Sequence, residues 1–104
     1  MALRQLSVQE RAEARRKALQ ARQARAELKA AFAAGEVGLA DIFARADADD
    51  AVARLRTVDL LLALPGVGEV RARAAMAGCG ISPRRRLGGL GRRQREALIA
   101  YIGR

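Results

Sequence analysis

Histidine and tryptophan are absent from this sequence of 104 residues, and cysteine occurs once, as Cys79. A lone cysteine without histidine cannot complete a Cys/His zinc site, and a catalytic triad that needs histidine is excluded for the same reason. Cys79 cannot form a disulfide within the chain, which agrees with a reducing compartment. We therefore expect no metal ion and no other cofactor, and we expect Cys79 to be a half-buried packing residue at a helix end.

Long apolar runs are also missing. No run approaches the roughly 18 residues of a membrane-spanning helix, and no segment pairs a basic face with a face of Trp, Phe and Leu, as membrane-surface helices do. The first residues, Met1 to Arg4, lack the apolar core of a signal peptide. These observations disfavour membrane binding and predict a cytoplasmic protein.

Aromatic residues number only three, and the apolar residues are mostly alanine, leucine and valine. Strand-like alternation of apolar and polar residues is absent, so helices packed on helices are the expected architecture. A chain of this length buries around 60–65% of its unfolded surface. The sequence therefore predicts one small all-α unit with a modest core and no large enzyme pocket.

Negative charge is scarce at both ends of the chain, whose net charge is +9. Residues 1–34 hold eight Lys/Arg against three acids, residues 35–68 three against six, and residues 69–104 nine against two. This asymmetry predicts two cationic surfaces on one small body, and a polyanion is the natural partner. The acidic middle is expected to face away from that partner.

The N-terminal segment predicts one long helix. Ser7 and Glu10 match a capping box, so the helix is expected from Val8 to Ala33, ending before Gly35. Ala21, Leu28 and Phe32 share a face that can dock on a core. A basic ridge is expected opposite that face, either as a second surface for a polyanion such as DNA or simply as a solvated face. Its members are Arg11, Arg15, Arg22, Arg25 and Lys29.

Short helices are expected in the remainder. Residues 39–43 have helical spacing, residues 47–50 form a break and an N-cap, and Thr57 is the expected cap of the next helix. Ser82-Pro83 is expected to start a short helical turn. A last helix is expected over 92–102, with Leu98, Tyr101 and Ile102 inward and Arg92, Arg93 and Arg95 outward. The predicted fold is all-α: a long N-terminal helix (1–34) plus a compact domain (35–104) of short helices, together forming one structural unit.

The stretch Leu64-Pro65-Gly66-Val67-Gly68 lies between an apolar run and a helix-favouring segment, which is the pattern of a helix, a glycine hairpin and a helix. Pro65 ends the first helix, and Gly66 and Gly68 permit a positive φ and close approach of another backbone. Val67 is expected to pack into the hairpin. The free amides at the start of the next helix favour an anion such as a phosphate oxygen, although an ordinary interhelical turn has the same pattern.

Arginines surround this hairpin in the sequence. Guanidinium groups bind phosphate oxygens bidentately. Three consecutive arginines beside a phosphate-binding loop are therefore suited to holding the sugar-phosphate backbone of a nucleic acid. Ion pairs with Asp41, Asp47 or Asp59 are the alternative for any one arginine. The expected DNA-binding residues, besides the hairpin Leu64–Gly68, are Arg71, Arg73, Arg84, Arg85, Arg86, Arg92 and Arg93, and Arg95 could extend the set.

The hairpin, the turn Gly80-Ile81-Ser82-Pro83 and the stretch Arg85-Arg86-Leu87 to Leu90-Gly91 resemble the actinobacterial (mycobacterial-type) integration host factors. The similarity spans nearly the whole chain, from Met1-Ala2-Leu3 onwards. It implies a nucleoid-associated protein that binds double-stranded DNA through a helix-two-turns-helix module like that of small-subunit ribosomal protein thirteen. It further implies DNA bending or looping, DNA compaction, effects on transcription and support of phage site-specific integration, with integrase nucleoprotein complexes among the implied partners.

Two positions depart from the family pattern. Glu69 stands where the family usually has lysine, and Gly88 stands where a further arginine is expected. Both changes should weaken the binding of the module to phosphate groups. Arg71, Arg84 and the basic first helix are the groups expected to compensate for this loss.

Two other functions share these features. A ribosomal-type protein that binds structured RNA uses the same module, and hairpin DNA glycosylases share the Leu-Pro-Gly-Val-Gly theme. Residues 69–104 contain no Lys, Asp or His, so a glycosylase lacks its catalytic pair and no enzyme activity is expected. Nothing in the arginine set reads bases, so we expect weak sequence preference and, since no apolar stripe is left undocked, a monomer.

Overall fold

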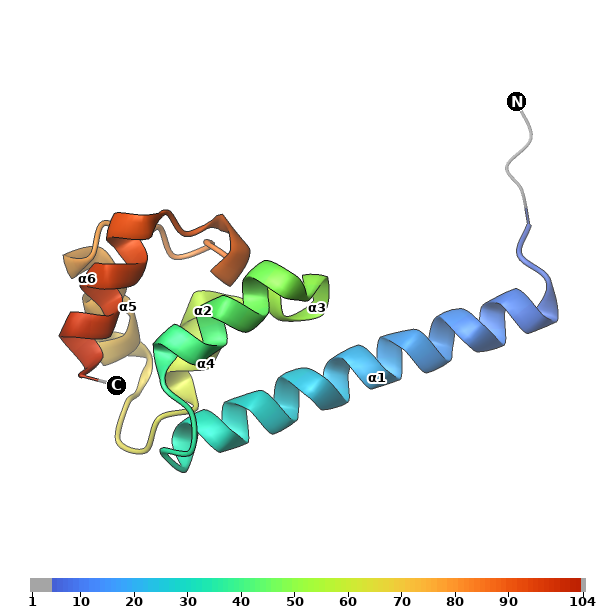
Figure 1. Ribbon diagram of the computed structural model, residues 1–104, viewed down its shortest axis with the longest axis horizontal. Helices are drawn as coiled ribbons and strands as arrows, with labels where there is room; N and C mark the ends of the chain where they lie inside the picture. The colour runs from blue at the N-terminus through green and yellow to red at the C-terminus, as the bar shows by residue number, and fades with distance from the viewer. Residues whose placement is uncertain (1–4, 104) are drawn as a thin grey trace.

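A computed structural model describes residues 5–103. Met1 to Arg4, used above for the signal-peptide argument and the resemblance, lie outside the described residues. Within them the chain is helical and has no strand, which confirms the predicted class (Figure 1). The elements are α1 (Val8–Ala33), α2 (Leu39–Ala48), α3 (Asp50–Ala53), α4 (Thr57–Leu62), α5 (Glu69–Gly78), the 3-10 helix η1 (Leu87–Gly89) and α6 (Arg92–Ile102).

Helix α1 begins and ends where the sequence predicts. Ser7 and Glu10 form the capping box: the Glu10 amide donates to Ser7 Oγ over 3.0 Å, and the Ser7 amide donates to Glu10 Oε1 over 3.3 Å. Only the last turns are anchored, through the buried side chains of Leu28 and Phe32. The first half therefore projects from the body of the molecule (Figure 1), and the structure with α1 included measures 48 × 32 × 25 Å along its principal axes.

The basic ridge of α1 does not lie opposite the docking face. Arg25 and Lys29 are half-buried, and both line hollows between α1 and the body. At about 100° per residue the ridge is centred roughly 80° from Leu28 and Phe32, so its C-terminal members fall at the edge of the contact. Arg11, Arg15 and Arg22 remain exposed. The prediction of an opposite face was wrong for this geometric reason.

The middle of the chain forms three short helices. Asp49 caps α3, with its Oδ1 accepting from the Ala51 amide over 2.9 Å, as the break at 47–50 predicts. Thr57 is not a cap: Arg56 occupies that position, and Thr57 is the first residue of α4. Its side chain is fully buried, and its hydroxyl has no hydrogen-bond partner in the part of the chain that the structure describes. The predicted cap was wrong because burial in the core outweighs the capping preference of threonine.

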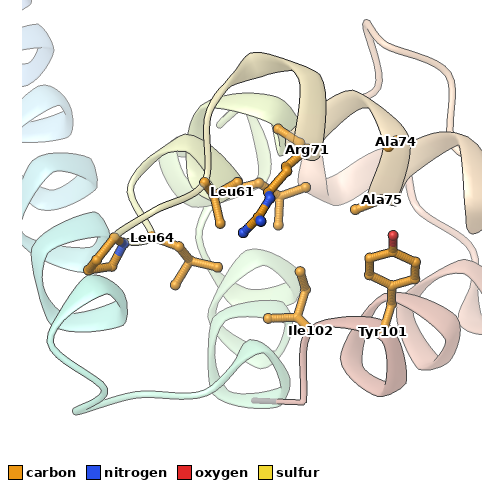
Figure 2. Close-up of a pocket in the computed structure, with 10 residues that line it drawn as sticks. Leu61, Leu64, Arg71, Ala74, Ala75, Tyr101 and Ile102 are labelled. Atoms are coloured by element: carbon orange, nitrogen blue, oxygen red, sulfur yellow. The ribbon is translucent and has the colours of Figure 1, made fainter.

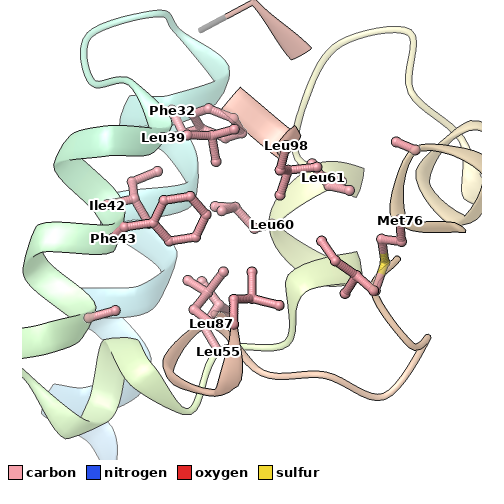
Figure 3. Close-up of a cluster of buried hydrophobic side chains, with 14 of the residues drawn as sticks. Phe32, Leu39, Ile42, Phe43, Leu55, Leu60, Leu61, Met76, Leu87 and Leu98 are labelled. Atoms are coloured by element: carbon pink, nitrogen blue, oxygen red, sulfur yellow. The ribbon is translucent and has the colours of Figure 1, made fainter. Parts of the chain in front are cut away.

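One hydrophobic core collects a side chain from nearly every element (Figure 3). Phe32 comes from α1, Ile42 from α2, Leu60 from α4, Met76 from α5 and Leu98 from α6, and all are at most 1% exposed. Helices as short as α3 and α4 are not stable alone, so this shared burial is what holds them in place. None of the helices in residues 5–103 is long and apolar enough to cross a bilayer.

The connection between α5 and α6 differs from the prediction. Residues 82–85 form a single turn, in which the Arg85 amide donates to the Ser82 carbonyl over 3.1 Å. The predicted short helical turn that begins at Ser82-Pro83 and carries Arg84, Arg85 and Arg86 is not formed. Arg86 is extended and pairs with Arg56 in an isolated antiparallel bridge. Gln94 at the start of α6 donates to the Gly80 carbonyl over 2.8 Å and so ties the two helices together. Ile81 is buried, as expected.

Helix α6 has the predicted bounds, but two of its side chains face the other way. Tyr101, expected inward, is 58% exposed. Arg95, expected outward, has a side chain only 19% exposed. Its guanidinium forms a bidentate pair with Asp47 at 2.9 Å, its Nε donates to the Leu90 carbonyl, and its Cζ lies 5.1 Å from the centroid of the Phe43 ring. Arg95 is a structural residue: the predicted outward orientation was wrong, and the alternative of an ion pair with Asp47 is the one that holds.

The Arg95–Asp47 pair makes stability depend on pH. Hydrogen bonds from Arg95, and its charge, hold the pKa of Asp47 below the ordinary value of 3.8. A carboxyl group whose pKa is lower in the folded than in the unfolded protein stabilises the fold at any pH above its unfolded pKa. This stabilisation is lost as the pH falls through the folded pKa. We expect Asp47→Asn to melt a few degrees below the wild type at about pH 6, and this gap in melting temperature to narrow as the pH falls below the ordinary pKa of 3.8. Thermal denaturation followed by circular dichroism measures it, and a gap that is constant with pH would contradict the assignment.

Candidate nucleic-acid interface

The hairpin Leu64–Gly68 joins α4 to α5 through a tight turn. The Val67 amide donates to the Leu64 carbonyl over 3.1 Å, Pro65 is the second residue of this turn, and Gly66 is the third, with φ of +78°. Proline followed by a residue at positive φ is the arrangement of a type II turn, which requires glycine at that place. Leu64 is buried and Val67 packs against the core, so the turn is held at both ends while Pro65 and Gly66 are exposed.

Gly68 does not use the positive φ that glycine permits. It is the N-cap of α5, with φ of −92° and ψ of −176°, a conformation open to any residue. A side-chain carbon at Gly68 would meet no atom within 4 Å. Neither the backbone nor the packing of the chain therefore requires a glycine at this position. The surface above it is open, and the first amides of α5 have no acceptor within their own helix.

Glu69 places a carboxylate in the first turn of α5. It lies 3.5 Å from the Arg73 guanidinium in an exposed pair one turn apart. Such pairs are weak and leave the arginine able to move to another anion. The departure at Glu69 thus has two effects in this structure: a negative charge sits beside the open amides, and Arg73 is partly neutralised.

Arg71 reaches away from the amides. Its side chain extends into an apolar groove of about 440 Å³ between the hairpin, α5 and α6, and the guanidinium points towards Leu64 and Ile102 (Figure 2). Tyr101 forms part of the far wall of this groove. Arg71 is exposed and has no ion pair among the described residues. The positive charge of Arg71 therefore lies in the groove beside the hairpin and not at the open amides of α5.

The arginine cluster Arg84–Arg86 is attached to the other end of α4. The Thr57 amide donates to the Arg85 carbonyl over 3.1 Å, and the Leu87 amide donates to the Leu55 carbonyl over 2.9 Å. The Arg86 guanidinium donates to the Arg54 carbonyl over 2.9 Å. Arg84 and Arg85 are exposed, and their guanidinium groups form no hydrogen bond or ion pair within residues 5–103. Arg86 is thus partly committed to the fold, whereas its two neighbours are free to bind an anion.

Helix α4 separates the cluster from the hairpin. The cluster pairs with residues at the start of α4 and the hairpin follows its end, so about 10 Å of helix rise separates Thr57 from Leu64. The two parts are therefore not adjacent, as the sequence interpretation assumed, and a ligand must be long enough to span α4 to meet both. Arg92 and Arg93 begin α6; Arg92 pairs with Glu96 over 3.0 Å in an exposed contact, and Arg93 has no partner among the described residues.

Gly88 in η1 packs tightly against α3. A side-chain carbon at this position would lie 2.8 Å from Ala53 Cβ, closer than real side chains approach each other. An arginine cannot be accommodated here without moving η1 or α3. The presence of glycine instead of arginine at position 88 therefore fits the close packing of η1 against α3, besides removing a positive charge.

Arg54 and Arg56 belong to the segment expected to face away from DNA, yet the structure places them beside Arg86 and Arg25 around one hollow. Counting charges over residues 35–68 as one segment did not reveal these two arginines, because the six acids of the segment outnumber its three arginines. The available signal was their position: both lie in the connection between α3 and α4, where exposed side chains are common.

The hairpin and its flanking helices have known counterparts. Residues 32–102 match the family model described as the S13-like H2TH domain. The fold and the hairpin therefore place the chain in the class of helix-two-turns-helix proteins.

Relatives of the same length narrow this class. The chain is 45% identical to the integration host factor of Mycobacterium tuberculosis over 99% of this chain and 98% of that protein, and 46% identical to that of Mycolicibacterium smegmatis over 95% and 94%. The chain belongs to this integration host factor family. It is also similar to a solved structure of sIHF bound to an 8-base-pair palindromic DNA, with a TM-score of 0.78 and 36% identity over 82% of this chain and 96% of that one.

Proposed function

We propose that this protein is a nucleoid-associated protein that binds double-stranded DNA with little sequence specificity, bends or loops it, and thereby supports DNA compaction, transcription and phage site-specific integration. The proposal rests on one observation: the hairpin is exposed at the open N-terminus of α5, and the exposed arginines Arg84 and Arg85 lie at the other end of α4. The solved DNA complex of a similar protein supports double-stranded DNA as the ligand.

The hairpin supplies neutral contacts and the arginines supply charge. Backbone amides at a helix N-terminus favour a phosphate oxygen, and an open Gly68 lets the sugar-phosphate backbone come close. We propose as DNA-binding residues Leu64, Pro65, Gly66, Val67, Gly68, Arg71, Arg73, Arg84, Arg85, Arg86, Arg92 and Arg93, and as a second surface Arg11, Arg15, Arg22, Arg25 and Lys29. These groups contact phosphates rather than base edges, which supports weak sequence preference.

The proposal includes where and how the protein acts. A monomer is supported by the core, which absorbs the apolar faces of the helices and leaves only scattered large apolar side chains exposed among residues 5–103. Relatives named integration host factor support a binding protein without catalytic activity, located in the cytoplasm on the nucleoid. Complexes with phage integrase on DNA remain part of the proposal.

Competition between nucleic acids tests the proposal against the RNA alternative. A fluorescent duplex of about 20 base pairs is titrated with the protein at about 0.15 M salt, and a structured RNA hairpin or unlabelled duplex is then added at equal phosphate concentration. We expect non-specific dissociation constants of about 10⁻⁴ to 10⁻⁶ M, a steep loss of affinity with salt, and no advantage for RNA. Energy transfer between labelled duplex ends should increase on saturation, because the protein bends the DNA.

Displacement by the RNA hairpin at a phosphate concentration tenfold below that needed for duplex would overturn the DNA assignment. An unchanged end-to-end distance at saturation would remove bending from the proposal while leaving binding intact. Duplexes of equal length and different base composition serve as the control for sequence preference.

A further inference from the structure

A hollow of about 390 Å³ lies where α1 passes the connection between α3 and α4. We call it the arginine hollow; its lining residues are Arg25, Arg54, Leu55, Arg56, Asp59 and Arg86. Four of the six are arginines and one is an acid. The hollow is distinct from the hairpin and brings together side chains from α1, from the α3–α4 connection and from the segment before η1.

The main chain and the core hold these arginines in place. The Arg56–Arg86 bridge and the hydrogen bond from the Arg86 guanidinium to the Arg54 carbonyl, 2.9 Å, fix three of them relative to one another. Arg25 is brought to the same place because Leu28 and Phe32 dock α1 on the body. The arginines are therefore gathered by the packing of the fold and not by attraction between their side chains.

The charges of the hollow are not balanced within it. No ion pair within 4.0 Å joins Asp59, or any other acid of the described residues, to the four arginines. Like charges held at one concave site repel each other and concentrate the field of the surface there. An anion with several oxygen acceptors relieves that repulsion, and phosphate fits the forked geometry of the guanidinium group.

The arginine hollow is followed along α4 by a second hollow, which lies nearer the end of that helix. Next to it along α1, Lys29 lines a second hollow with Asp59 and Leu62 of α4. Helix α1 therefore runs beside α4 from the arginine hollow towards the hairpin. The helix rise of about 10 Å along α4 is comparable with the major-groove width of about 12 Å, so phosphates flanking one groove can reach both places.

We propose that the arginine hollow seats a backbone phosphate of the same duplex that the hairpin holds, so that α1 and the helix-two-turns-helix body grip one DNA rather than two. The inference rests on the proposed DNA-binding function. It assigns roles to Arg54 and Arg56, and it makes Arg25 the residue where the basic ridge of α1 joins the body.

The test uses the full chain with Arg25, Arg54 and Arg56 changed to glutamine, singly and together. Arg86 is left intact because its guanidinium supports the fold. Arg16→Gln is the control for charge, since Arg16 is exposed on another face of α1 and makes only a long contact of 3.4 Å with Glu13. Affinity for a duplex of about 12 base pairs is measured as a function of salt under conditions where one protein binds one duplex.

Loss of one phosphate contact flattens the salt slope by about 0.9 and weakens binding on the order of fivefold at about 0.15 M salt. We expect this effect in the triple variant and less in Arg16→Gln. Far-ultraviolet circular dichroism and a melting curve verify folding; if the triple variant does not fold, Arg54→Gln alone is compared with Arg16→Gln. A slope equal to that of the control overturns the inference.

Two further arms separate the possible failures. If the hollow variants match the control while Arg84→Gln/Arg85→Gln weakens binding, the inference fails and the proposed function stands; if neither changes the slope, both fail. In the second arm, the NMR signals of the Arg25 and Arg86 Nε–H groups should shift with DNA and not with inorganic phosphate at equal phosphate concentration. Equal shifts with both would make the hollow a site for free phosphate and overturn the assignment to DNA.

Discussion

Replacing Arg84 and Arg85 together with glutamine is expected to weaken binding to duplex DNA on the order of 30-fold at about 0.15 M salt, and to flatten the salt slope by about 1.8. Each phosphate contact contributes about 0.9 to the slope, and both side chains are exposed without a partner in residues 5–103. The loss should be the same for every DNA sequence, because phosphate contacts carry no base information. Fluorescence anisotropy at several salt concentrations measures both quantities.

The matched control for that variant removes the same charge elsewhere. Arg16→Gln/Arg45→Gln changes two exposed arginines on α1 and α2 and leaves the proposed interface unaltered. Its slope should stay close to that of the wild type. If both double variants lose affinity equally, the effect comes from net charge alone and the arginine cluster has no special role.

Replacing Phe32 with alanine is expected to lower the free energy of unfolding by about 3–5 kcal/mol. Phe32 is fully buried in the core and, with Leu28, anchors α1 to the body. Small domains have only about 5–15 kcal/mol in total, so much of the stability should disappear. The result also tests our proposal that residues 1–34 and 35–104 form one structural unit, because independent parts would not share this loss. Urea denaturation followed by circular dichroism measures it.

Leu19→Ala is the control for the loss of an apolar side chain from α1, since Leu19 is 49% exposed and lies outside the core. It should change stability by less than about 1 kcal/mol. A Phe32→Ala variant as stable as Leu19→Ala would mean that α1 does not dock through Phe32 in solution. The arginine hollow would then lose its Arg25 wall as well.

Local signals made much of the fold predictable. The capping box at Ser7 and Glu10, the proline and glycine of the hairpin, and the apolar spacing of α2 act within a few residues along the chain. Such interactions are present in the sequence itself and need no knowledge of distant segments. The bounds of α1 and α6 and the turn at Gly66 were accordingly correct.

The errors concern side chains whose surroundings come from distant segments. Arg95 points inward because Asp47 and Phe43, from α2, offer it a bidentate partner and a ring. Tyr101 remains exposed because its position on α6 faces the groove beside α5 and not the core. Helical periodicity orders the faces of one helix, but it does not say which face another helix will cover.

The candidate site divides in the same way. The hairpin was recognisable because glycine and proline restrict a turn wherever it occurs. The arginine hollow was not, because its arginines are separated by up to 61 positions between Arg25 and Arg86 and meet only through the Arg56–Arg86 bridge and the docking of α1.

The sequence alone determined the helical class, the long first helix, the hairpin and the excess of positive charge, since each depends on composition or on neighbours within a turn or two. Only the tertiary structure decided which arginines are committed to the fold, that α4 separates the hairpin from the arginine cluster, and that α1 meets the body at Arg25. Those outcomes depend on how the short helices bury their shared apolar surface, which is a property of all of them together.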